Sequence, residues 1–216
     1  MFQLLFYLFF WNRYYHKHKE KSTFNHKLTL NKIGLIHAIS SVVLTLLFFI
    51  TDNYWLLDDI YYVSTSYFLY DIYHLIKSKR SISNYTLIIH HCIAIYSLDW
   101  IFYPTWAMAI LDLLAMAELS NIPGYFTYYF KKKSNTKKQE SITNFMILCQ
   151  TIVYFSVRVV YFPTILFTYD ISKYPIQFHI FLGLLYIMGL IWSWKLIGQS
   201  RQIIINKCYN TQLKLN

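Results

Sequence analysis

Three side chains in this sequence could form an acid–base pair within apolar surroundings: Asp71, His90 and His91. All three lie in apolar stretches, where ionisable groups are costly and usually mark functional sites. Asp71 and His90 are equally distant in sequence from the junction between Arg80 and Ser81, so two antiparallel helices would place them at similar depth. An aspartate beside a histidine fixes one imidazole tautomer and makes the other nitrogen more basic. The spacing predicts an Asp71–His90 pair, with either histidine able to act as base or nucleophile.

Other polar residues inside the apolar stretches also fall on single helical faces. Side chains three or four positions apart share one face of a helix. The resulting stripes are Ser64, Tyr67, Asp71 and His74; Glu118, Asn121 and Tyr125; Gln150, Tyr154, Arg158 and Tyr161; and His37, Ser41 and Thr45. Together they predict a bundle with a polar interior. Arg158 requires a counter-charge, and Glu118 or Asp112 is the expected partner, although such a buried pair often only holds helices in register.

The elements that carry these residues are predicted to be membrane-spanning helices. The chain of 216 residues is 56% hydrophobic and 14% charged, whereas a soluble domain carries about a quarter charged residues. A bilayer takes about 20 apolar residues to cross, and spans must be helices or a closed barrel. Six stretches qualify, at residues 33–50, 59–76, 85–102, 105–130, 145–168 and 176–197. The predicted fold is an all-α integral membrane bundle or barrel of six helices, with residues 1–11 either a short additional span or an interfacial segment.

The loops between these stretches alternate in charge. Residues 13–32, 77–80, 131–138 and the tail from 195 are basic, whereas residues 52–59, 99–105 and 169–175 are acidic or nearly neutral. Basic loops stay cytoplasmic, so the C-terminus is predicted to be cytoplasmic. The net charge of +10 lies in loops beside apolar spans, which favours anionic lipid headgroups as partners and not nucleic acid.

The chain is predicted to contain one membrane domain with short flanks. Residues 1–30 would form an N-terminal apolar segment and a basic loop, residues 31–201 the six-helix domain, and residues 202–216 a basic tail. Cys92, Cys149 and Cys208 show no paired spacing, so no disulfide framework and no metal site is expected. No bound cofactor is expected either.

The order of the motifs resembles that of the TLC-domain family. The matching pieces are Ser-x-x-Tyr-Phe-x-x-Asp at 64–71, the His90–His91 pair, Glu118-x-Ser-Asn, Arg158-Val and Trp192-x-Trp-Lys. No single piece is specific, but their order and spacing cover most of the chain, about residues 31–201. The resemblance implies a six-helix transmembrane barrel and a location in the endoplasmic reticulum.

Ceramide synthases of this family use a paired histidine to move a fatty acyl group from CoA to a sphingoid amine. By similarity, His90 and His91 would be the acyl-transfer histidines and Asp71 would support them. Two aspartates of the ceramide synthase pattern are replaced here by Glu118 and Asn121, and the threonine after the histidine pair is missing. The chain therefore looks closer to the small TLC-domain proteins, which are linked to membrane phospholipid composition.

The resemblance leaves two classes of function open. In the first, the chain is an acyltransferase that moves an acyl group from acyl-CoA, its co-substrate, to a lipid amine or hydroxyl. Its catalytic residues would be His90, His91 and Asp71, and the supporting or substrate-binding residues Ser64, Tyr67, His74, Glu118, Asn121 and Arg158. In the second, the chain binds lipid without catalysis, or helps cargo or insertion in the endoplasmic reticulum. Membrane lipids are the expected partners in both cases, and a homodimer is a further expectation.

Overall fold

The structure, a computed structural model, describes residues 2–21, 26–78, 81–133 and 136–215, and their regular structure is entirely helical. The helices are α1 (Phe2–Lys21), α2 (His26–Thr51), α3 (Trp55–Lys77), α4 (Ile82–Leu98), α5 (Pro104–Lys133), α6 (Lys137–Phe155), α7 (Phe162–Thr168) and α8 (Ile176–Leu215). Short 3₁₀ segments follow α4 (η1, Asp99–Phe102) and α7 (η3, Ile171–Lys173), and a π-helical turn joins α6 to α7 (η2, Ser156–Tyr161). The predicted all-α class is confirmed. Parts of three predicted basic loops, residues 22–25, 79–80 and 134–135, lie outside the described residues.

Each of the six predicted spans coincides with a helix or with a continuous run of helical segments. Among the described residues, five helices are long and apolar enough to cross a membrane. These are His26–Thr51, Ile82–Phe102, Pro104–Lys133, Gln139–Ile165 and Ile176–Lys207. The second predicted span, α3, is not among them; its sequence contains Asp58, Asp59, Asp71 and His74 among apolar and tyrosine residues.

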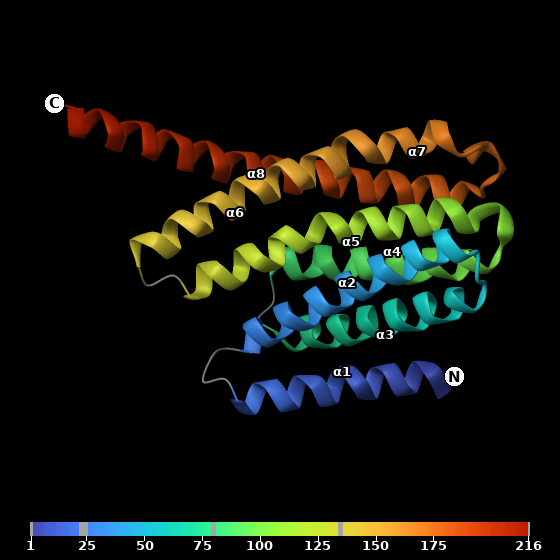
Figure 1. Cartoon of the computed structure of the whole chain (residues 1–216). Helices are drawn as coiled ribbons and strands as arrows, with labels where there is room; N and C mark the ends of the chain where they lie inside the picture. The colour runs from blue at the N-terminus through green and yellow to red at the C-terminus, as the bar shows by residue number, and fades with distance from the viewer. Residues whose placement is uncertain (1, 22–25, 79–80, 134–135, 216) are drawn as a thin grey trace.

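Six helices form a closed ring. Going round the bundle, α2, α5, α6, α8, α4 and α3 each contact the next, and α3 returns to α2. Successive helices run in opposite directions, so the short connections alternate between the two ends of the bundle (Figure 1). This arrangement agrees with the predicted six-helix bundle or barrel.

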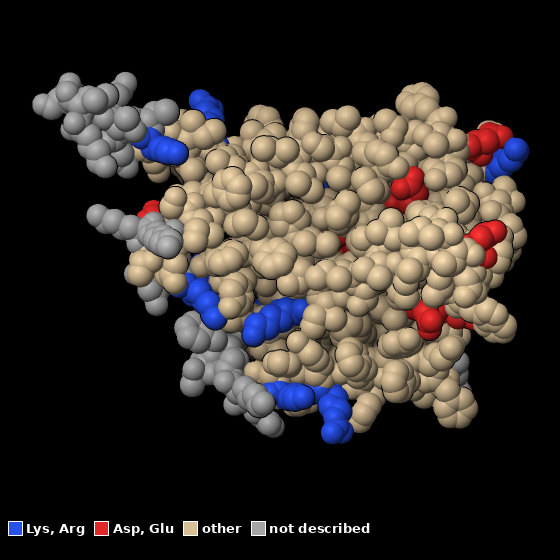
Figure 2. All heavy atoms as spheres, viewed as in Figure 1, with Lys and Arg blue, Asp and Glu red and all other residues tan. Residues whose placement is uncertain are grey.

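The two ends of the bundle differ in charge. We call "basic end" the end at which α3 meets α4 and α5 meets α6, and "acidic end" the end at which α2 meets α3 and α7 meets α8. On the face seen in Figure 2, Lys and Arg gather mainly towards the basic end and Asp and Glu mainly towards the acidic end. Lys173, a basic residue at the acidic end, is paired with Asp170 through an Nζ–Oδ2 contact of 2.9 Å. The hydroxyl of Ser172 and the Lys173 ammonium hold the pKa of the Asp170 carboxyl below its ordinary value.

Helix α1 lies outside the ring and packs against α3 and α2. Its N-terminus points to the acidic end (Figure 1). Trp11 and Tyr15 are buried, and the Trp11 indole Nε1 donates to Ser66 Oγ at 3.0 Å. The sequence left the placement of residues 1–11 open; residue 1 lies outside the described residues, and residues 2–11 begin a 20-residue helix that docks along the bundle. Among the described residues, α1 is not one of the helices apolar enough to cross a membrane on its own.

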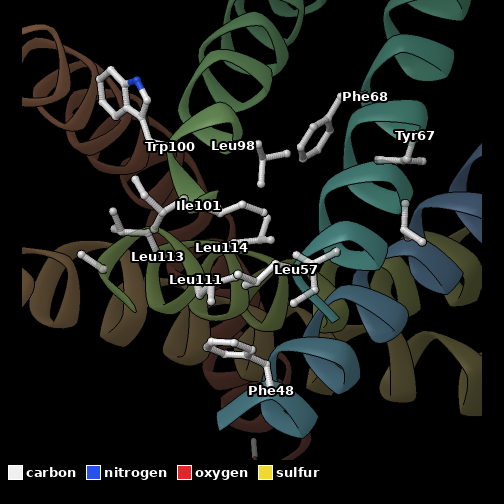
Figure 3. Close-up of a cluster of buried hydrophobic side chains, with 14 of the residues drawn as sticks. Phe48, Leu57, Tyr67, Phe68, Leu98, Trp100, Ile101, Leu111, Leu113 and Leu114 are labelled. Carbon is white, nitrogen blue, oxygen red and sulfur yellow. The ribbon is translucent and has the colours of Figure 1, made fainter. Parts of the chain in front are cut away.

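Much of the apolar core lies in the half of the ring towards the acidic end. Phe48 lies near the end of α2, Leu57 near the start of α3, Ile101 just after α4 and Leu111 in the first half of α5. Antiparallel packing brings these segments together, and Ile101 and Leu111 are fully buried (Figure 3). The core therefore anchors the helices whose other halves carry the polar stripes.

Candidate functional site

The half of the ring towards the basic end contains a partly open cavity of about 750 Å³. Ligand sites in proteins commonly have volumes of about 300–1,000 Å³. Side chains from α2, α3, α4, α5, α6 and α8 line it, including Tyr67, Asp71, His74, His90, His91, Glu118, Asn121, Tyr125, Gln150, Tyr154 and Trp192. At the helix ends its lining includes His26, Lys27, Ser78, Ser81 and Asn84. The predicted polar stripes of α3, α5 and α6 thus meet around one space.

Asp71 and His91 form a hydrogen-bonded pair in the cavity wall. Asp71 Oδ2 and His91 Nε2 are 2.8 Å apart, and the His91 ring stacks on Phe68 with a centroid distance of 5.0 Å. The prediction of an Asp71–His90 pair is therefore corrected. His90 and His91 differ in depth by only about 1.5 Å, but they point about 100° apart around α4. The direction of the side chain, and not its depth, decides which histidine faces α3.

His90 points towards α8. Its ring lies 5.9 Å from the Trp192 ring. Besides lining the main cavity, His90 borders a second space of about 60 Å³, which is walled mainly by apolar side chains of α3, α4, α5, α7 and α8, with Arg158 and Glu118 also at its edge. His90 is therefore placed between a large polar cavity and a small, largely apolar pocket.

Glu118 borders both spaces and is buried. Asn121 Nδ2 donates to its Oε2 at 3.4 Å, and His37 Nδ1 lies 3.8 Å from the same oxygen. The predicted site residues Glu118 and Asn121 are thus brought together, with a histidine of α2 behind them.

Arg158 lies on the π-helical turn η2 and is 2% exposed. Its Nε donates to Ser120 Oγ at 3.0 Å, and its terminal nitrogen to the Ala117 carbonyl at 3.1 Å. No ion pair joins it to a carboxylate among the described residues. The predicted ion pair of Arg158 with Glu118 or Asp112 is therefore wrong. A π-turn shifts the helical register, and from this turn the guanidinium reaches a side-chain hydroxyl and a backbone carbonyl of α5.

Asp112 lies away from the cavity and accepts hydrogen bonds from two tyrosines. Tyr161 donates to Asp112 Oδ2 at 2.8 Å and Tyr169 donates to the same oxygen at 3.2 Å. Asp112 is thus hydrogen-bonded by two tyrosines, and Arg158 is hydrogen-bonded to Ser120 and Ala117.

The remaining predicted site residues divide between the cavity and the layer behind it. Tyr67 and His74 line the cavity, and the His74 ring packs between Tyr15 and Tyr70. Ser64 does not line it: this fully buried residue shares a hydrogen bond of 3.2 Å with Ser41.

Sequence reasoning did not assign a site role to His37, to Tyr125, Gln150 and Tyr154, or to the residues of the helix ends. The signal was present, because His37, Gln150 and Tyr154 belong to polar stripes. What the sequence could not show is which stripes face one common space. Among the described residues, no group of three or more His, Cys, Asp or Glu side chains is arranged to hold a metal ion.

Comparison with known families decides the relationship. The family model described as the TLC domain matches residues 31–198, which include most of α2, all of α3 to α7 and the first part of α8. The chain belongs to the TLC-domain family. Searches of curated proteins and of solved structures each returned no match. The TLC domain and the apolar helices identify an integral membrane protein with a lipid-related function. Helix α1 lies outside the matched TLC domain although it packs on the ring.

Proposed function

We propose that this TLC-domain protein transfers a fatty acyl group from acyl-CoA to the amine or hydroxyl of a membrane lipid. The observation that carries the proposal is the Asp71–His91 pair at 2.8 Å in the wall of a large polar cavity. A general base is commonly a histidine that donates the N–H of one ring nitrogen to a carboxylate and accepts a proton on the other ring nitrogen.

The reaction needs one proton acceptor. Asp71 accepts the Nε2 proton of His91, which leaves the lone pair on Nδ1. Nδ1 has no hydrogen-bond partner among the described residues. It takes the proton from the lipid amine or hydroxyl as that group attacks the thioester carbonyl. The new C–N or C–O bond forms, the C–S bond breaks, and the proton passes to the departing CoA sulfur to give the free thiol.

The two cavities suit the polar part and the acyl chain of acyl-CoA. The main cavity offers polar groups, and the small, largely apolar pocket beyond His90 accepts part of an acyl chain. His90, which borders both spaces, then lies beside the acyl carbonyl. The positive-inside rule places the basic end, towards which the cavity lies, in the cytoplasm, where acyl-CoA is found. The endoplasmic reticulum membrane and a cytoplasmic C-terminus belong to the same proposal.

The test uses microsomes that contain the full chain, labelled acyl-CoA and mass spectrometry of the acyl-lipid products. His91→Ala and Asp71→Asn should lower the transfer rate by about 10²-fold or more, the usual contribution of a general base. His179→Ala is the matched control, because His179 lies at the start of α8 near the acidic end and contacts the Pro175 carbonyl.

Transfer at the wild-type rate by His91→Ala would overturn the proposed base. Lipid binding without catalysis predicts another result. The wild-type chain would make no acyl-lipid product, and expression of the wild type and of His91→Ala would shift the lipid composition of the cell equally.

A further inference from the structure

A second histidine–carboxylate pair lies behind the cavity, between α2 and α5. His37 is fully buried, and its Nε2 shares a hydrogen bond of 3.1 Å with Ser41 Oγ. Its Nδ1 has no hydrogen-bond partner among the described residues and faces Glu118 Oε2 at 3.8 Å. The mechanism above does not use this histidine.

The two oxygens of Glu118 have different surroundings. Oε2 accepts a hydrogen bond from Asn121 Nδ2 at 3.4 Å, and His37 Nδ1 lies 3.8 Å from the same oxygen. None of the hydrogen bonds or ion pairs among the described residues uses Oε1, although Glu118 lines the cavity. One oxygen thus has both protein neighbours on its side, and the other has no protein partner among the described residues.

The position of His37 is set by aromatic contacts that include α1. The His37 ring stacks on Tyr67 at 3.9 Å with an interplanar angle of 11°. Trp11 places its edge against both rings, at 6.5 Å from His37 and 6.0 Å from Tyr67. The Trp11 indole is itself tied to Ser66 Oγ at 3.0 Å. A helix outside the matched TLC domain therefore supports a layer that contacts the site.

We infer that His37 is a positioning residue that directs Glu118 Oε1 into the cavity, where this oxygen accepts a hydrogen bond from the amine or hydroxyl of the bound lipid. The identity of that lipid group rests on the proposed function. A carboxylate oxygen binds an ammonium or a hydroxyl through a charge-assisted hydrogen bond. The same oxygen repels an anionic headgroup, so the pair selects ligands that carry a donor.

The test measures binding without acyl-CoA, so that it is independent of catalysis. Two fluorescent probes of equal chain length are titrated into the detergent-solubilised full chain: a long-chain amino alcohol, and a methyl ester that lacks N–H and O–H donors. His37→Phe keeps an aromatic ring against Tyr67 but removes both nitrogens. It should weaken binding of the amino alcohol by about tenfold, the usual cost of losing one charge-assisted hydrogen bond, and leave the ester within about twofold.

Three further variants sharpen the result. Glu118→Gln should reproduce the selective loss, and His37→Gln, which retains a side-chain donor, should recover part of it. Trp11→Phe should act in the same direction by about threefold, because it removes the bond to Ser66 and part of the ring that packs on His37 and Tyr67. His179→Phe is the control and should bind both probes as the wild type does.

Equal loss of both probes in His37→Phe, or wild-type binding of the amino alcohol, would overturn the inference. Absence of acyl transfer by the wild-type chain would sink the proposed reaction, but the binding ratio of the two probes would still decide the role of His37.

Discussion

In the acidic half of the bundle Asp112 accepts hydrogen bonds from Tyr161 and Tyr169, whereas in the basic half the Tyr154 hydroxyl and His91 Nδ1 have no partner among the described residues. The same contrast holds for Asp99 near the acidic end, which accepts from Tyr61 at 2.7 Å. A buried polar group without a partner is costly, so it persists where something other than stability requires it. These two carboxylates of the acidic half thus have tyrosine partners, although Thr45 Oγ1 in that half has none among the described residues, whereas in the basic half His90, His91, Tyr128 and Tyr154 each have an unpartnered atom and line the cavity.

Packing follows the same division. Leu111 and Ile101 are fully buried in the acidic half, while the basic half is hollowed by the cavity of about 750 Å³. The two halves are built from the same helices, so the packed half can hold the open half in shape. Arg158 lies where they meet, on a π-turn, a distortion that is frequent at functional sites.

The contrast predicts that substitutions in the two halves have separable effects. Changes in the acidic half should alter the free energy of unfolding and leave the ligand affinity of the folded protein unchanged. Removal of a single polar group at the cavity should lower ligand affinity and leave the free energy of unfolding unchanged. Overpacking against a cavity side chain, as at Gly34, should alter both quantities, and the other substitutions below would break the contrast if they altered the wrong one.

The largest loss of stability is expected for Leu111→Ala. Leu111 is fully buried in the core, and truncation of such a leucine usually costs about 2–5 kcal/mol. Equilibrium unfolding in mixed micelles measures this cost. Leu184→Ala is the control, because Leu184 is 42% exposed on α8. Weaker binding of the amino alcohol by the folded fraction of Leu111→Ala would mean that the two halves are not separable.

An intermediate loss is expected for Gly34→Ala, together with weaker binding. A Cβ at Gly34 would lie 2.6 Å from Tyr125 Cε1, so the Tyr125 ring, which lines the cavity, must move. Overpacking of this kind costs about 1–3 kcal/mol. Gly198→Ala is the matched control: a Cβ there meets nothing within 4 Å, and alanine in a helix is favoured over glycine by about 0.5–1 kcal/mol. Probe titration and unfolding of both variants test whether the close approach at Gly34 shapes the cavity.

A smaller loss is expected for Tyr161→Phe. This variant loses the hydroxyl bond to Asp112 but leaves Tyr169 in place, so unfolding should become easier by about 1 kcal/mol. Ligand affinity should stay within about twofold of the wild type. Tyr103→Phe, at a 54% exposed tyrosine, should change neither quantity. A clear loss of ligand affinity in Tyr161→Phe would place Asp112 in the functional site after all.

Much of the fold follows from local properties of the chain. Apolar length sets the spans, loop charge distinguishes the two ends, and the spacing of three and four residues places Asp71 on one face with Tyr67 and His74. These features depend on neighbours along the helix, and the structure agrees with them for the described residues. The match to the TLC domain confirmed the family that the motif order predicts.

The errors arose where contacts depend on direction or on distant segments. Depth along α4 cannot distinguish His90 from His91, because only the rotation of α4 decides which one meets Asp71. Charge alone predicts a carboxylate partner for Arg158, whereas its guanidinium, on a π-turn, binds a carbonyl and a hydroxyl of α5. The docking of Trp11 on Ser66 joins residues far apart in sequence, which helical periodicity does not reveal.

The smallest effect on stability is expected for Tyr154→Phe, and it tests the contrast most directly. Tyr154 lines the cavity and is buried, but its hydroxyl forms no hydrogen bond among the described residues. Its ring lies 5.4 Å from the Arg158 guanidinium, and phenylalanine preserves that contact. Stability should therefore stay within about 0.5 kcal/mol of the wild type, because no hydrogen bond is lost. Affinity for the amino alcohol should fall by about three- to tenfold if the hydroxyl serves the ligand. The same Tyr→Phe change at position 161 predicts the reverse, so unfolding and probe titration of the two variants side by side settle whether the open half exists for a ligand. A loss of stability in Tyr154→Phe equal to that of Tyr161→Phe, with unchanged binding, would show that both halves are merely structural.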